Sequence, residues 1–276
     1  MRTLNMLLLG ALLTTPGYAA VSELRLYVLD CGHATFKEMG EFSDTGEYDG
    51  KSGEVAVPCF LIRHPKGDLL WDLGLGDRFA AFKEGSDAAP GVHISVPLTL
   101  VSQLEALKLE PKDINYVAFS HLHWDHTGNA NEFPEAVWIM NKAELNASTA
   151  LPPPNGVLPD TFSAYKSAKV ETIEDDYDVF GDGTVMILRA PGHTPGHQVL
   201  KLKLQKSGTV ILSGDLYHLR ANRDFKRVPV FNANRADTLA SMGRVETILK
   251  NTAGRLIVQH DPHDYQALPK PPAFLE

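Results

Sequence analysis

The sequence is poor in cysteine and in positive charge, and each shortage argues against a class of function. Only two of its 276 residues are cysteine, and neither has the spacing of a cysteine-based metal or redox motif. Asp and Glu number 34 against 26 Lys and Arg, for a formal net charge of −8. Because nucleic-acid binding relies on clustered Lys and Arg to neutralise phosphates, we expect no nucleic-acid partner.

Long apolar runs are also missing, apart from a short one at the N-terminus. Arg2 precedes a mostly apolar stretch, 4–13, which is followed by small residues in 16–20. This order is typical of a secretory signal peptide. The run falls well short of the ~20 residues that a membrane-spanning helix needs. We therefore expect residues 1–20 to be a signal peptide and the mature protein to be periplasmic or secreted, with no membrane span.

Export would place Cys31 and Cys59 in an oxidising compartment. Each lies in or beside an apolar segment that is typical of a strand, so a disulfide between neighbouring strands is one possibility. Two buried free thiols are the alternative, because the sequence does not supply the Cα separation that a bridge requires.

The most informative stretch is His121-Leu122-His123-Trp124-Asp125-His126, which holds four potential metal ligands in six residues. The apolar run 114–119 before it indicates a buried strand, so the histidines stand at a strand end. Imidazole and carboxylate groups are poor core material and good zinc ligands. A polar loop with several histidines is the alternative, and it does not account for this density. A tight turn and a helix after the strand would direct His121 and His123 to one site, and Asp125 and His126 to a second.

Other predicted strands also end in His or Asp. The strands in the second half of the chain lead to His193, Asp215 and His260. Because equivalent strand ends meet at one edge of a sheet, we expect these side chains to converge. His197 begins the next strand and is interpreted as a residue that hydrogen-bonds nearby backbone. Asp72, at the exit of an earlier strand, either caps a turn or supports the site from outside.

In this order, and after the turn Asp72-Leu73-Gly74, these residues resemble the motifs of the metallo-β-lactamase superfamily. The resemblance covers nearly all of the mature chain, and its histidine-rich motif is highly specific. It implies an α/β fold, the αβ/βα sandwich, in which two facing mixed sheets carry helices on their outer sides. It also implies that residues 21–276 form a single hydrolase domain with a dinuclear metal site between the sheets.

The resemblance further implies a role for each ligand candidate. One metal would be held by His121, His123 and His193, the other by Asp125, His126 and His260, with Asp215 bridging both. Two divalent ions fit this His and Asp set, and zinc is expected, although manganese, iron and cobalt also tolerate it. The implied reaction is hydrolysis by a metal-bridging hydroxide, which makes Asp125 a candidate catalytic residue as well as a ligand.

Within the superfamily, the chain resembles in particular the N-acyl-homoserine lactonases that quench quorum sensing. The resemblance rests on the predicted strand 57–61, on Trp124 inside the histidine motif and on the stretch 191–198. It implies a small-molecule lactone as substrate. Those lactonases have a tyrosine shortly after the bridging Asp, and Tyr217 is therefore a candidate catalytic residue. It stands one residue earlier than expected, at the position before His218.

Apolar residues near these motifs have two interpretations. Phe36, Met39, Phe42 and Trp124 would suit contact with an acyl chain, but packing within the core or a loop is the preferred one.

Three other functions share parts of the pattern. A metallo-β-lactamase uses the same metals on an amide and is also exported. A glyoxalase II type thioesterase shares the histidine motif, but no basic patch suits an anionic glutathione thioester. A non-catalytic metal-binding module would need the same ligands, whereas open metal positions favour bound water and therefore catalysis.

Overall fold

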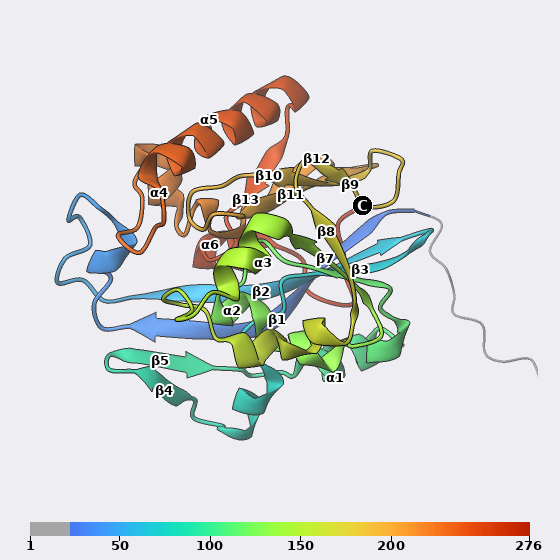
Figure 1. Cartoon of the computed structure of the whole chain (residues 1–276), viewed down its shortest axis with the longest axis horizontal. Helices are drawn as coiled ribbons and strands as arrows, with labels where there is room; N and C mark the ends of the chain where they lie inside the picture. The colour runs from blue at the N-terminus through green and yellow to red at the C-terminus, as the bar shows by residue number, and fades with distance from the viewer. Residues whose placement is uncertain (1–22) are drawn as a thin grey trace, which may run out of the picture.

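The computed structural model describes residues 23–276, so the predicted signal peptide lies outside the described residues. Two β-sheets face one another at the centre, and helices cover their outer sides (Figure 1). The predicted αβ/βα sandwich is thereby confirmed. Among residues 23–276, no helix is long and apolar enough to cross a membrane.

The larger sheet has 8 strands in the order β4-β5-β1-β2-β3-β6-β7-β8, and the smaller has 5 in the order β13-β12-β11-β10-β9. Both sheets are mixed, because β3, β6, β7 and β8 are parallel, as are β12 and β13, while the hairpins are antiparallel. The bounds in the larger sheet are β1 Arg25–Phe36, β2 Gly53–His64, β3 Gly67–Trp71, β4 Ser86–Ala89, β5 Val92–Ser95, β6 Tyr116–Ala118, β7 Val137–Asn141 and β8 Lys169–Ile173. Those in the smaller sheet are β9 Tyr177–Asp178, β10 Val185–Arg189, β11 Gln198–Leu204, β12 Gly208–Leu212 and β13 Arg255–Ile257.

The main core lies between the two sheets and follows from the period of two in each strand. In β11, Leu200 and Leu202 face the larger sheet, where they share a buried cluster with Phe60 and Trp71 of β2 and β3. Val199, the intervening residue, packs instead in the cluster on the opposite face of the small sheet. Each sheet therefore buries both of its faces.

Helices complete the outer layers. Helix α5 packs Met242, Val245 and Leu249 against the smaller sheet, and its N-cap Asn234 accepts hydrogen bonds from the first-turn N–H groups. Helix α1 packs Leu100 and Leu104 against the larger sheet. The helices are α1 Leu100–Ala106, α2 Trp124–Thr127, α3 Lys142–Ser148, α4 Arg220–Phe225, α5 Arg235–Thr252 and α6 Pro262–Ala267.

The N-terminal strand differs from its prediction. Residues 31–53 are rich in Gly, Asp and Glu, a composition that predicts a loop, whereas β1 continues to Phe36 through a bulge between Asp30 and His33. The second half of β1 pairs with β2 and also with β5, from a segment predicted to be a connection. Pairing on both sides stabilises a strand that its Gly and polar residues do not favour on their own.

Cys31 and Cys59 form a disulfide between β1 and β2, with Cα atoms 5.6 Å apart. Both residues are buried in the core on the outer face of the larger sheet. The first of the two interpretations left open by the sequence is therefore the observed one.

Candidate metal centre

Four strand ends deliver the predicted ligands to one edge of the sandwich. In the larger sheet, β6 leads through Ser120 to His121 and His123, and α2 then presents Asp125 and His126. In the smaller sheet, β10, β12 and β13 run in the same direction and lead to His193, Asp215 and His260, respectively. The structure thus brings together all seven side chains that the sequence singled out as ligands.

The first ligand group consists of His121, His123, His193 and Asp215, whose nearest donor atoms all lie within 4.8 Å of one another. His193 Nε2 is 3.2 Å from His121 Nε2 and 3.2 Å from His123 Nδ1. Three imidazole nitrogens from both sheets therefore face a common point.

The second ligand group consists of Asp125, His126 and His260, also within 4.8 Å. The Nε2 atoms of its two histidines are 3.1 Å apart. Asp125 Oδ2 lies 3.7 Å from each of these nitrogens.

Asp215 lies between the two groups. Its Oδ1 is 2.9 Å from His260 Nε2 and 3.1 Å from His126 Nε2. Its Oδ2 is 3.4 Å from His193 Nε2 and 3.7 Å from His121 Nε2. One carboxylate oxygen thus faces each group, which is the arrangement that a bridging ligand requires.

These residues fit divalent cations chemically. Burial lowers the pKa of His123 to about 4, and it also lowers the pKa values of His121 and His193 well below 6.5. The three imidazoles of the first group are therefore neutral at pH 7, the form that ligates metals. His193 Nε2 faces two other ring nitrogens, and a single proton on it cannot satisfy both contacts. A cation at the common point satisfies all three lone pairs.

Asp72 supports the second group from behind. Its Oδ2 is 3.0 Å from His126 Nδ1, and its Oδ1 accepts the backbone N–H of Ser120 at 2.7 Å. Gln259 Nε2 donates to the same carboxylate at 2.9 Å. Of the two roles considered for Asp72, it therefore fills the supporting one, and Gln259 is a supporting residue that the sequence did not indicate.

His197 behaves as the sequence suggested. Its Nδ1 is 2.9 Å from the carbonyl oxygen of Ala190, and its Nε2 accepts the backbone N–H of Asp215 at 2.9 Å. Burial lowers its pKa to about 4, so the ring is neutral and holds the backbone at the bridging residue.

The structure does not bring Tyr217 to the ligands. Its hydroxyl donates to Glu246 Oε1 at 3.1 Å, and its ring packs in the cluster beneath α5. The backbone at Tyr217 is extended, with φ −138° and ψ 125°, so neighbouring side chains point to opposite sides. His218 is therefore the residue that faces the site, with Nε2 2.9 Å from Asp215 Oδ2.

Aromatic side chains adjoin the same edge of the site. The rings of Phe42 and Phe231 lie 5.5 and 5.3 Å from that of His218, and Phe231 is also 6.0 Å from His193. Phe42 and Met39 are buried, in agreement with a packing role, whereas Phe36 and Trp124 are only half-buried.

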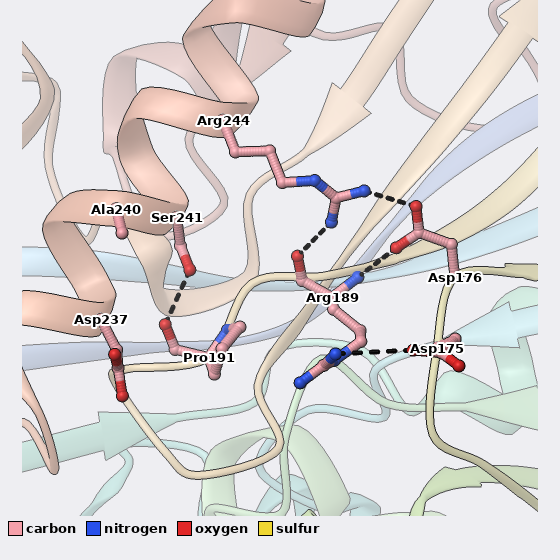
Figure 2. Close-up of a pocket in the computed structure, with 8 residues that line it drawn as sticks. All are labelled: Asp175, Asp176, Arg189, Pro191, Asp237, Ala240, Ser241 and Arg244. Atoms are coloured by element: carbon pink, nitrogen blue, oxygen red, sulfur yellow. Dashed lines mark hydrogen bonds and ion pairs between the residues drawn. The ribbon is translucent and has the colours of Figure 1, made fainter.

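A surface pocket of about 550 Å³ lies elsewhere, beyond the turn that carries His193 (Figure 2). Figure 2 shows Arg244 of α5 joined to Asp176 and to the carbonyl oxygen of Arg189, and Ser241 joined to that of Pro191. Its charged groups pair largely with one another, and none of the seven ligand candidates lines it.

Comparisons with known proteins agree with this geometry. Residues 52–260 match the model of the metallo-beta-lactamase superfamily. The chain is 30% identical to N-acyl homoserine lactonase AttM of Azorhizobium caulinodans, over 93% of this chain and 100% of that protein.

Two solved structures share the fold. An N-acyl homoserine lactone hydrolase with the product N-hexanoyl-L-homoserine at its catalytic metal centre has a TM-score of 0.79 at 24% identity, covering 92% of this chain and 100% of its own. AidC, a dizinc quorum-quenching lactonase, has a TM-score of 0.65 at 20% identity, covering 89% and 91%. On the family match and on the identity to AttM, the chain belongs to the metallo-β-lactamase superfamily and, within it, to the family of the N-acyl homoserine lactonases.

Proposed function

We propose that this protein is a dinuclear lactonase that opens the ring of N-acyl-homoserine lactones, with two divalent ions, zinc by preference. The observation that carries the proposal is the convergence of seven ligand side chains, with Asp215 directing one oxygen to each group. The substrate class follows from the relatives, which are N-acyl homoserine lactonases over nearly their full length. The preference for zinc rests on the dizinc relative of the same fold.

The chain's own residues define how a substrate would reach the ions. His121, His126, His193 and His260 are buried, whereas His123, Trp124 and Asp125 are half-buried and mark the open side. A substrate therefore approaches over α2. The aromatic side chains of Trp124 and Phe231 adjoin this side, and they suit the acyl substituent better than a charged one.

Two bound divalent ions supply Lewis acidity toward the lactone carbonyl and activate a water as nucleophile. Net hydrolysis, in which water adds to the lactone carbonyl and the ring C–O bond breaks, would yield N-acyl-homoserine, whose carboxyl group would release a proton near neutral pH. His218 is placed to hold Asp215 in its bridging orientation, because its Nε2 is 2.9 Å from Asp215 Oδ2.

The test is a panel of substrates with zinc-loaded and cobalt-loaded protein, read out by proton release. The panel contains short- and long-chain N-acyl-homoserine lactones, simple lactones and a chromogenic β-lactam. We expect rapid hydrolysis of the N-acyl-homoserine lactones. Preference for the β-lactam, or no turnover by protein that holds both metals, would contradict the proposal.

We also propose that the protein is exported to the periplasm or beyond. The pattern in residues 1–20 supports this, and so does the disulfide between Cys31 and Cys59, because such bridges persist in oxidising compartments. Mass spectrometry of protein isolated from the periplasmic fraction should show a chain that begins after residue 19 or 20. An uncleaved chain confined to the cytoplasm would exclude export.

A further inference from the structure

Glu144 is a buried carboxylate that does not belong to either ligand group. It comes from the first turn of α3 and is 3% exposed. Its Oε1 accepts the backbone N–H of Leu122 at 3.0 Å, and its Oε2 accepts that of Gly196 at 3.0 Å. Each carboxylate oxygen thus binds a different segment of the chain.

The two segments are the ones that carry the histidines of the first group. Leu122 lies between His121 and His123, and Gly196 follows His193 by three residues. The first segment continues the larger sheet and the second leaves the smaller one. The Glu144 carboxylate therefore joins, across the two sheets, the loops whose imidazole nitrogens meet 3.2 Å apart.

The contact between α3 and the His193 loop is close and depends on glycine. A Cβ atom at Gly196 would lie 2.3 Å from the backbone nitrogen of Glu144 and 2.5 Å from its Cβ. Asn141, the N-cap of α3, fixes the same turn by accepting hydrogen bonds from Ala143 and Glu144. The carboxylate therefore extends from a capped helix turn.

The second ligand group has a different support. Asp72 contacts His126 and is itself held by Ser120 and Gln259, whereas no hydrogen bond among the described residues links it to Glu144. Each ligand group therefore has its own buried carboxylate behind it. Mutation of residues that orient metal ligands in this way typically weakens metal affinity about 10–100-fold.

We propose that Glu144 is a positioning residue specific to the metal held by His121, His123 and His193. The proposal rests on the two-metal site proposed above and adds that Glu144 and Asp72 support different ions, although the two groups share Asp215 and the Ser120 hydroxyl, which lies 3.0 Å from His121 Nδ1 and 3.2 Å from His126 Nδ1. Glu144→Gln keeps the size of the side chain but offers one acceptor oxygen for two backbone N–H groups. One loop then loses its tether while α3 keeps its position.

The experiment measures each metal site separately. Wild type, Glu144→Gln and Asp72→Asn are equilibrated with zinc at a series of buffered concentrations. Stepwise affinities come from chelator competition, and anomalous diffraction at the zinc edge gives the occupancy of each position. We expect Glu144→Gln to weaken the first position about 10–100-fold and to affect the second much less. Asp72→Asn should show the reverse.

Two further variants keep the outcome interpretable. Glu135→Gln, an exposed residue before β7, is the matched control and should retain wild-type affinity at both positions. If Glu144→Gln does not fold, Glu144→Asp supplies the same test, because its shorter side chain keeps the charge but does not span both loops. Equal weakening of both positions, or no weakening of the first, would overturn the proposal.

Failure of the proposed function would look different. Wild-type protein that binds one ion, or binds two without hydrolysing any lactone, would contradict the dinuclear lactonase. An ion at the first position alone would still allow the Glu144 comparison. An ion at the second position alone would overturn both.

Discussion

Asp125 is the most exposed member of its ligand group, with 21% of its side chain accessible, against 2% for His126 and 3% for His260. In the proposed lactonase it would therefore contact both a metal and the substrate. We expect Asp125→Asn to abolish lactone turnover, because a neutral amide is a poor substitute for an anionic ligand. The measurement is kcat/KM with a zinc-saturated sample, beside circular dichroism of the same protein.

The fold should survive this change, since the contacts of Asp125 with His126 and His260 belong to the ligand group and not to the hydrophobic core. Asp160→Asn, at an exposed residue, is the control and should keep full activity. Hydrolysis at the wild-type rate by Asp125→Asn would remove Asp125 from the ligand set.

Tyr217 has a packing role that can be separated from catalysis. Its buried hydroxyl donates to Glu246, and burial raises its pKa, with a further contribution from Glu246. We expect Tyr217→Phe to lower the free energy of unfolding by about 1–2 kcal/mol and to leave kcat unchanged. Urea unfolding and lactone kinetics on one preparation test both. A large fall in kcat at unchanged stability would restore the catalytic role that the sequence suggested.

The residues also show where sequence reasoning reaches its limit. The dense motif at 121–126 predicted metal binding, because several imidazoles at the end of a buried strand are rarely explained by packing. The choice between Tyr217 and His218 depended on the direction of one extended residue, which no pattern fixed. Glu144 follows Asn141 by three residues, which is the spacing of a helix capping box. From the sequence, Glu144 would therefore be assigned to the cap of α3, and its contacts with two distant loops could not be predicted.

Among the secondary-structure elements, the turn that follows β12 packs closely against the end of β6 and the start of β11. Gly214 has φ +50°, and a Cβ there would lie 2.6 Å from Ser120 Cβ and 2.7 Å from His197 Nε2. We expect Gly214→Ala to displace the Asp215 loop from β6 and to lower both metal content and stability, the latter by at least about 1 kcal/mol from backbone strain alone. Metal analysis and thermal unfolding test this. Gly243→Ala, with open space around it on α5, is the matched control and should not reduce either quantity.

The bulge of β1 gives a pH-dependent prediction. His33 Nε2 lies 3.2 Å from Asp30 Oδ1, and the hydrogen bond that the Asp30 carboxylate accepts from His33 raises the pKa of His33 above 6.5 against the effect of burial. Glu54 favours the charged form, whereas Lys270 opposes it. A raised folded-state pKa stabilises the protein below pH 6.5, and the benefit disappears as the pH rises through that pKa.

The test is urea unfolding of wild type and His33→Gln at pH values from about 5.5 to 8.5, which span the usual titration range of histidine. We expect the stability difference to be largest at the acidic end and to shrink as the pH rises. A difference that grows with pH would show that His33 is neutral in the folded protein throughout.

The elements were predicted unevenly for a physical reason. Strands with clear alternation, such as β11, and helices with one buried face, such as α5, can be recognised from sequence because burial on one face sets their composition. The hairpin of β4 and β5 has little apolar content and depends on pairing with β1, a contact that lies outside any local window.

In the molecule as a whole, the candidate metal centre lies between the two sheets and takes ligands from both. His121, His123, Asp125 and His126 follow a strand of the larger sheet, and His193, Asp215 and His260 follow strands of the smaller one. Ions that bind only the folded chain stabilise it by about 4.1 kcal/mol per site when free metal is 1,000 times Kd. Stability and activity should therefore depend on the same ions.

We expect removal of the metals by a chelator to lower Tm by on the order of 10 °C, and readdition of zinc to restore it. Differential scanning calorimetry without reductant keeps the Cys31–Cys59 disulfide intact, so the change reports on metal alone. Chelator saturated with zinc beforehand is the control. If Tm is the same with and without metal, the interface between the sheets holds the site in place unaided. The ions then serve chemistry and not the joining of the two sheets.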